Sequence, residues 1–231
     1  MIRRTFVLGT VLLLSVPLGA QVGYPPSSSP YEDLRGKQGV SITLGLLAPG
    51  LDPARVGPHQ GALVTGRYEL KLANALWLRA RLGLAPGLER RVKDPLFSDS
   101  LRDFGTTTDA YVLGDVGFAL HLTGNKSWRR IVPQVHGGFG FISSVGEAYD
   151  LGAYRFGNKF QLSYGVGARI ASRGPWEMQV DVTHMFWKYK YPDAYGGDGS
   201  TTDVSILRDG SLQGWKGNMI FQAGVTRYFF R

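Results

Sequence analysis

The chain has 231 residues, of which 43% are hydrophobic and 12% aromatic, with 32 glycines and a formal net charge of +8. It contains no cysteine, which excludes a disulfide framework, a thiolate metal site and a lipid-modified cysteine. Its lysines and arginines are scattered singly or in pairs such as Arg129-Arg130, with no longer basic run, so the positive charge does not indicate nucleic-acid binding.

The first twenty residues have the pattern of a secretory signal peptide. Met1–Arg4 is basic, Phe6–Leu18 is mostly apolar, and Leu18–Ala20 ends in small residues. The apolar run is shorter than the ~20 residues that a membrane-spanning helix needs. We therefore expect residues 1–20 to be removed on export and residues 21–37, rich in proline and serine, to form a linker.

Downstream of Gln38, eight segments alternate apolar and polar residues, a pattern typical of β-strands. In the second segment, for example, Val64 and Tyr68 alternate with Arg67 and Glu69. The segments are Gly39–Leu47, Gln60–Leu70, Asn74–Leu84, Asp109–Leu122, Arg130–Ser144, Lys159–Ala171, Trp176–Tyr189 and Trp215–Phe230. None of them has the periodicity of an amphipathic helix.

Alternation alone does not say which face is inside, because a soluble barrel buries its apolar face and a membrane barrel turns it toward lipid. The apolar faces are long enough to cross a bilayer, and the polar faces combine charges with many glycines, which suits a narrow lumen. Aromatic residues near the segment ends are expected to form interfacial girdles. They are Trp77, Trp128, Trp176, Phe186, Trp187, Tyr189, Tyr191, Trp215, Tyr228 and Phe229.

The connections alternate in length along the chain. Three are short, Lys71–Ala73, Thr123–Trp128 and Ser172–Pro175, and four are long, Ala48–His59, Ala85–Thr108, Val145–Asn158 and Lys190–Gly214. Membrane barrels have short periplasmic turns and long outer loops. The predicted fold is therefore all-β: a transmembrane up-and-down antiparallel β-barrel of about eight strands, over residues 38–231.

The last segment alternates up to its terminal aromatics, with Phe221, Val225, Phe229 and Phe230 as the key positions. It resembles the C-terminal strand of bacterial outer-membrane β-barrels. The whole region resembles the small eight-stranded barrels of the opacity-protein and OmpA transmembrane-domain type. This resemblance implies a place in the Gram-negative outer membrane, contact with its lipid and lipopolysaccharide, and recognition of the last strand by the barrel-assembly machinery.

An eight-stranded barrel is just wide enough for its inward side chains to fill it. The candidate lumen residues carry both signs, so we expect a structural charge network and a plugged interior, because an unpaired buried charge is costly. The network comprises Arg67, Glu69, Arg79, Arg81, Asp115, Arg169, Glu177 and Asp181.

The sequence shows no catalytic, cofactor-binding or metal-binding motif. Its four histidines lack paired metal spacing, and the aspartates of the last loop lack calcium-loop spacing. Some outer-membrane barrels that deacylate lipid A have a His-x-Ser pair on the lipid-facing wall. Here His184 is followed two residues later by Phe186, so we interpret His184 as an interfacial residue.

We expect a non-enzymatic surface or envelope protein whose long extracellular loops bind an unidentified ligand, with no cofactor. Two other interpretations stay open at this point. One is an outer-membrane barrel enzyme that acts on lipid A or phospholipid. The other is a secreted, soluble, lipocalin-like barrel that carries a lipophilic ligand.

Overall fold

The computed structural model describes residues 29–34, 36–94, 97, 101–146, 154–196, 206–207 and 211–229. The strands are β1 (Tyr31–Asp33), β2 (Gln38–Pro49), β3 (Gly61–Lys71), β4 (Leu76–Lys93), β5 (Asp103–His121), β6 (Lys126–Trp128), β7 (Ile131–Val145), β8 (Asn158–Ile170), β9 (Trp176–Lys190) and β10 (Gln213–Phe229), and η2 (Asp193–Gly196) is a 3-10 turn. Across these described ranges, no helix is long and apolar enough to cross a membrane. The expected signal peptide and Phe230 lie outside them.

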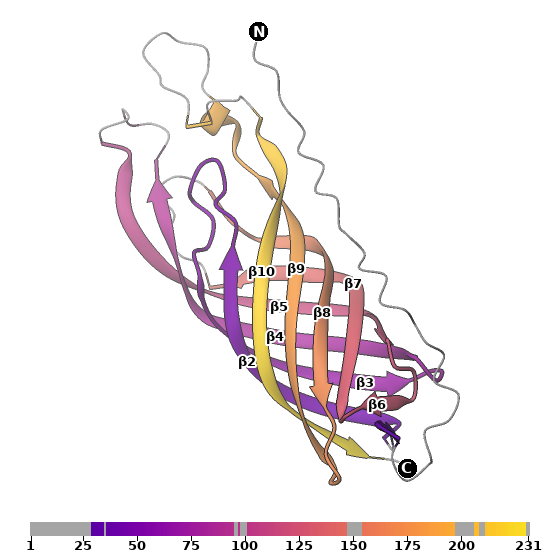
Figure 1. Cartoon of the computed structure of the whole chain (residues 1–231). Coiled ribbons are helices and arrows are strands. Elements are labelled where there is room, and N and C mark those ends of the chain that lie inside the picture. Colours follow the sequence, from indigo (N-terminus) through magenta and orange to yellow (C-terminus); the bar gives the residue numbers. More distant parts are fainter. Residues whose placement is uncertain are drawn as a thin grey trace, which may run out of the picture. The chain divides into compact units, whose positions relative to one another are not determined.

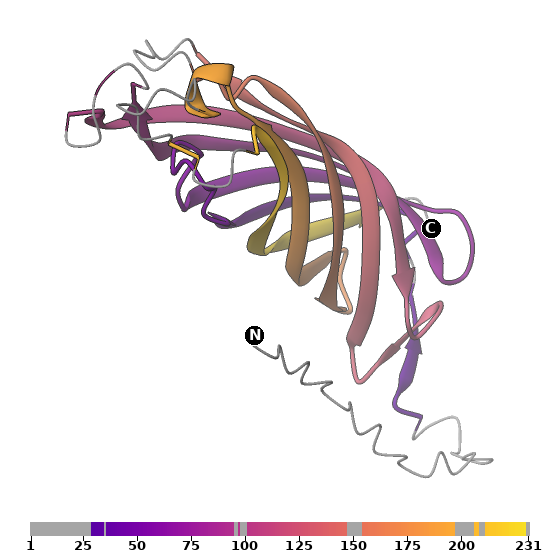
Figure 2. The ribbon, with the colours of Figure 1, turned by 90° about the horizontal axis from the view of Figure 1, so that it is seen from above.

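The eight long strands form one closed sheet (Figures 1 and 2). Each pairs antiparallel with its neighbours in the chain order β2-β3-β4-β5-β7-β8-β9-β10, and β10 then pairs with β2. This closing seam runs in register from Phe229↔Gln38 to Asn218↔Pro49. Closure leaves no unpaired edge along the wall. The predicted eight-stranded up-and-down barrel is confirmed.

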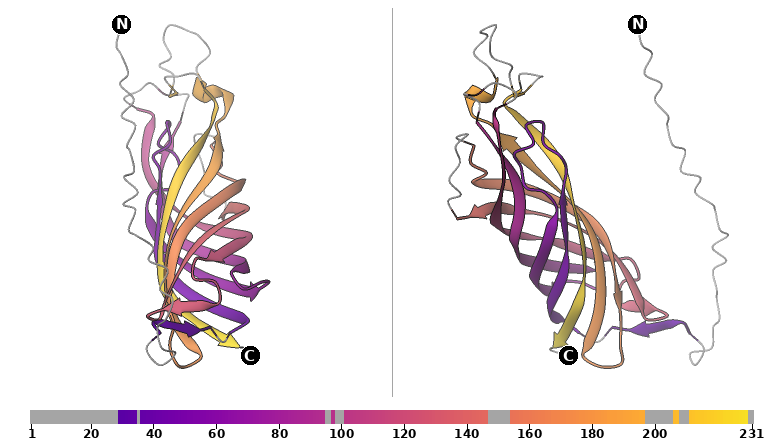
Figure 3. Two further views of the ribbon diagram at one scale, coloured as in Figure 1. Left: turned by 45° about the vertical axis from the view of Figure 1, so that its right-hand side comes forward. Right: turned by 90° about the vertical axis from the view of Figure 1, so that its left-hand side faces the viewer.

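The connections divide the barrel into two ends, visible in Figure 3. Residues 72–75, 122–130 and 171–175 join strands at one end, which we call the short-turn end. The strand ends that flank the longer connections, residues 50–60, 94–102, 146–157 and 191–212, lie at the other end, which we call the long-loop end. The alternation of short and long connections therefore agrees with the sequence pattern.

The connection between β4 and β5 is shorter than predicted, because both strands continue past the expected loop boundaries. A register shift at Ala85/Leu88 interrupts the ladder, and pairing then resumes as far as Lys93↔Asp103. Pro86 and Gly87 hide this continuation in the sequence, because they are residues that usually end strands. The predicted loop Ala85–Thr108 is wrong in most of its length.

A small two-stranded element lies at the short-turn end, where the sequence predicted only linker and turn. β1 pairs with β6, with Tyr31↔Trp128 and Asp33↔Lys126 as the outer pairs. β6 joins β7 through Arg129 and Arg130, whose φ angles of 48° and 68° lie in the left-handed region of backbone conformation. Two successive left-handed residues make the tight hairpin turn that usually takes glycine or asparagine.

Candidate functional site

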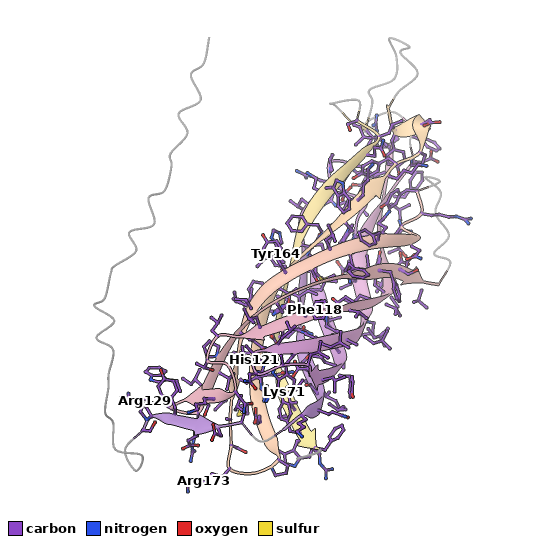
Figure 4. All side chains as sticks on the ribbon, turned by 90° about the vertical axis from the view of Figure 1, so that its right-hand side faces the viewer. Lys71, Phe118, His121, Arg129, Tyr164 and Arg173 are labelled. Atoms are coloured by element: carbon purple, nitrogen blue, oxygen red, sulfur yellow. The ribbon has the colours of Figure 1, made fainter. Side chains whose placement is uncertain are left out.

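The outer face of the barrel is apolar on all eight long strands. In Figure 4, Phe118 and Tyr164 lie on this wall, whereas Arg129 and Arg173 lie at the short-turn end. The exposed wall residues include Ile42, Leu44, Val64, Leu82, Val116, Phe118, Phe139, Phe160, Val166, Met178, Val180, Phe221 and Val225. Their neighbours in sequence point inward and are mostly polar, including Thr43, Thr65, Gln161 and Asp181. The predicted facing of the strands is therefore confirmed.

The structure brings all eight predicted lumen charges into the interior. Asp181 lies at the centre of one group, where its carboxylate is 2.8 Å from Arg67 Nη2 and 3.7 Å from Arg79 Nη1. Arg67 also reaches Glu69, with Nη1 3.6 Å from Oε1. Gln134 donates to Oδ1 of Asp181 at 3.2 Å, so three side chains from three strands, Arg67, Arg79 and Gln134, contact this carboxylate.

Two further ion pairs continue the network toward the two ends. Arg81 forms a bidentate pair with Asp115 and donates to Gln222 at 3.2 Å. Arg169 pairs with Glu177 at 2.8 Å and lies 4.1 Å above the ring of Tyr228. The eight charges comprise four cations and four anions, so the formal charge within this set is balanced.

Little free space remains beside these charges. The void next to Arg79 and His136 has a volume of about 10 Å³, room for about one water molecule. A larger pocket of about 720 Å³ lies at the short-turn end, between Glu32 and the turn at Arg173, and Tyr228 lines it. Tyr228 donates to Glu69 at 2.9 Å and so ties the lining of this pocket to the charge network.

The part of the interior nearest the long-loop end is apolar, which the sequence analysis missed. Inward side chains of the strands pack there against residues of three long connections. This group, which we call the loop plug, comprises Ala54, Val56, Leu63, Leu88, Tyr111, Tyr154, Phe156, Trp187, Tyr189, Tyr191, Tyr195 and Leu207. All of these side chains are buried.

The predicted aromatic girdle is wrong for about half of its members. Trp77, Trp187, Tyr189, Tyr191 and Tyr228 are buried inside the barrel. Trp128, Trp176 and Trp215 do lie exposed on the outside. Inward and outward aromatics differ only in the phase of the alternation: Trp187 and Tyr189 share the phase of Asp181, which would have identified them as interior residues.

Asp52 is a buried carboxylate that contacts the loop plug through Tyr191. It accepts hydrogen bonds from the Tyr191 hydroxyl at 2.8 Å and from the backbone N–H groups of Gly57 and Val56 at 2.8 and 3.3 Å. Burial, and next the negative charge of Asp52, raise the pKa of Tyr191 well above its usual value. Burial likewise raises the pKa of Tyr154.

His184 lies on the outer wall and not in the interior. Tyr164 is its hydrogen-bond partner, with the hydroxyl 3.0 Å from Nδ1, and the imidazole packs against Phe186 at 4.2 Å between ring centroids. No group of three or more His, Asp or Glu side chains that could hold a metal occurs among the described residues.

The expected assembly residues of the last strand lie on the outer face where they are described. Phe221 and Val225 are exposed, and Phe229 is half-buried. Arg227 shares this face and its guanidinium lies 5.7 Å from the ring of Trp176. Tyr228 has the opposite phase and points inward.

A closed barrel with an apolar exterior, a charged interior and strands of 11 to 19 residues is the form that spans the outer membrane. The chain is therefore an integral outer-membrane β-barrel of the small eight-stranded class. The lipocalin-like alternative is wrong, because a soluble barrel would bury the apolar side chains that this one exposes.

Comparison with solved structures agrees with this class. OprG, an outer membrane protein of Pseudomonas aeruginosa, has a TM-score of 0.51 and 12% identity, over 88% of this chain and all of that one. The N-terminal β-barrel domain of Pseudomonas aeruginosa OprF (TM-score 0.45, 11% identity, 84% and 100% coverage) and the outer membrane protein AlkL (0.49, 14%, 90% and 96%) are also similar. Neither a known family nor a curated protein matches the sequence.

Proposed function

We propose that this barrel is a closed, non-enzymatic protein of the outer membrane, whose long-loop end faces the cell exterior and acts as a surface for an unidentified ligand. One observation carries the proposal: among the described residues, the charge network and the loop plug fill the middle of the interior and its long-loop end, and the pocket of about 720 Å³ lies at the short-turn end. A side-chain-filled lumen leaves the ends of the barrel, and not a channel, as the functional surfaces.

The closed lumen predicts the absence of conductance. The purified, refolded barrel inserted into planar bilayers should give no discrete current steps, and liposomes that contain it should swell in small sugars no faster than empty ones. A regular, reproducible single-channel step from the wild-type barrel would contradict the proposal.

The orientation is testable because the chain has no cysteine. A single Leu51→Cys variant places a thiol on an exposed residue of the long-loop end, and Arg173→Cys places one in a short turn. On intact cells, a membrane-impermeant maleimide should label Leu51→Cys and leave Arg173→Cys unlabelled until the cells are lysed. The reverse labelling pattern would overturn the proposed orientation.

The alternative of a lipid-modifying enzyme has less support. His184 contacts Tyr164 and Phe186 on the outer wall, and among the described residues no serine or carboxylate is bonded to it. A histidine without a nucleophile to deprotonate or an acid to orient it lacks the parts of an acyl-transfer site. Lipid A mass spectra of cells with and without the protein should be identical. A new acylation state in cells that contain the protein would support the enzyme alternative and contradict the non-enzymatic proposal.

The last strand supports a role in assembly. Phe221, Val225 and Phe229 lie on one outer face of β10, where a partner in the membrane can reach them. We expect recognition of this face by the barrel-assembly machinery. Replacing Phe229 with serine should lower the amount of folded barrel in the membrane, whereas the same change at exposed Phe118 should have a smaller effect.

A further inference from the structure

We propose that the outer wall of β8, β9 and β10 holds a docking site for a phosphorylated, multiply acylated glycolipid of the lipid A class. The site consists of Lys188, Lys190 and Trp215 near the long-loop end, with Tyr164 and His184 below them. The site gives the chemical class of a ligand for the proposed surface protein. It rests on the proposed function, and in particular on the proposed orientation, because this glycolipid occupies the outer leaflet.

In the upper part of the site, the outward side chains of β9 change abruptly from uncharged to basic. The outward residues of β9 remain uncharged up to Phe186 and then become Lys188 and Lys190, both exposed. Trp215 of β10 pairs directly with Lys188 in the sheet register and is 51% exposed. No ion pair of either lysine occurs among the described residues. Two free ammonium groups beside an indole ring match the phosphates and sugar face of a glycolipid.

The lower part is a polar pair within an otherwise apolar belt. Ionisable residues at membrane depth are costly and usually mark a binding role. The Tyr164 hydroxyl lies 3.0 Å from His184 Nδ1, and Tyr164 is 55% exposed on the wall. When the hydroxyl donates to Nδ1, the neutral imidazole carries its proton on Nε2. The Nε2–H group then points away from Tyr164, which is the only hydrogen-bond partner of His184 among the described residues.

Gly217 makes the space for this donor. A side chain at position 217 would place its Cβ 2.4 Å from His184 Nε2 and 3.4 Å from the Phe186 ring, so only glycine lets the imidazole lie in this position. Gly217 pairs with Phe186 in the register, and Met219 with His184. Glycine at position 217 thus leaves the imidazole packed against the Phe186 ring on the outer face, where its N–H donor suits an ester or amide carbonyl.

The spacing fits one class of lipid best. Four residues separate Lys188 from His184, or ~13 Å along a strand, and strand tilt reduces this to a depth of roughly 10 Å. Lipid A has phosphates on its sugars and ester and amide carbonyls just below them, so one molecule reaches both parts. A glycerophospholipid offers a phosphate and carbonyls but no sugar face for Trp215.

Binding can be measured on the purified full-length protein, independently of its orientation in cells. Native mass spectrometry in detergent would be titrated with bisphosphorylated lipid A, dephosphorylated lipid A and phosphatidylglycerol. We expect wild type to retain the bisphosphorylated form, and Lys188→Gln/Lys190→Gln to weaken this binding by about tenfold or more. Tyr164→Phe and His184→Phe should each weaken it by about threefold, as expected for one hydrogen bond.

The matched control is Lys126→Gln/Arg173→Gln, which removes the same charge at the short-turn end and should bind like wild type. All variants must first show the heat-dependent gel shift of a folded barrel. Equal binding by wild type and Lys188→Gln/Lys190→Gln, or equal retention of phosphatidylglycerol, would overturn the site. Specific binding together with periplasmic labelling of Leu51→Cys would instead overturn the orientation, so the two failures are distinguishable.

Discussion

Asp181 is the residue on which the interior charge balance depends most, because Arg67 and Arg79 both lie against its carboxylate. Replacing it with asparagine keeps the shape and leaves two buried guanidinium groups with too little negative charge. Asp181→Asn should destabilise the folded barrel by about 3–5 kcal/mol, measured by urea titration in lipid vesicles. Asp33→Asn, at an exposed position of β1, is the control and should change stability little.

A single substitution at Val166 tests whether the outer face of β8 is turned toward lipid. Val166 is 57% exposed on the outer face, whereas Ser163 is buried on the inner face of the same strand. Val166→Arg should cost about 2–4 kcal/mol if the site is near the bilayer midplane. Ser163→Asn should be milder, and equal effects in refolding yield would contradict the assigned facing.

Tyr191 links the loop plug to Asp52, and the plug should respond to alkaline pH. Because folding raises the pKa of Tyr191, this residue contributes stability that is present below the unfolded value of about 10 and is lost as pH rises toward the folded value. Hydrogen exchange in residues 50–60 should therefore accelerate above about pH 10. Exchange that is independent of pH after correction for intrinsic rates would contradict this coupling.

A Tyr191→Phe variant separates the hydroxyl from the ring. It removes the donor to Asp52, a hydrogen bond to a charged group worth about 1.5–3 kcal/mol, and keeps the aromatic packing. Limited proteolysis at neutral pH should cut residues 50–60 faster than in wild type. Tyr31→Phe, on exposed β1, supplies the control.

At the level of strands, alternation predicted well because it is a local property of each segment. The facing of Val64 against Arg67, or of Val166 against Ser163, follows from period two once one face is assigned. The loop plug could not be predicted in this way. Whether Tyr191 and Tyr154 enter the lumen depends on the path of two connections and on Asp52, more than 100 residues from both, which no periodicity encodes.

The dependence on contacts between distant residues also explains the errors in the predicted strand ends. Beyond Pro86 and Gly87 the alternation continues, with Arg90 inward and Arg91 outward, and pairing to Asp109 and Asp103 supports it. These partners lie across the hairpin, so the extension becomes visible only when both strands are aligned. β1 and β6 were missed for a similar reason, because each is only three residues long.

Over the whole molecule, an apolar wall and a hydrogen-bonded closed sheet together predict a barrel that resists detergent. Unheated samples in sodium dodecyl sulfate should migrate differently from boiled ones, and protein extracted from cells should fractionate with the outer membrane. Recovery of the processed protein as a soluble periplasmic species would contradict the membrane assignment.

The seam between β2 and β10 joins the earliest barrel strand to the final one. Chain synthesis must therefore be complete before the wall can be sealed, and any product that stops short of β10 exposes two ladders of unsatisfied backbone groups to the hydrocarbon. Such fragments have no stable way to remain in a bilayer. The barrel can therefore close only when the whole wall, from β2 to β10, is available for pairing.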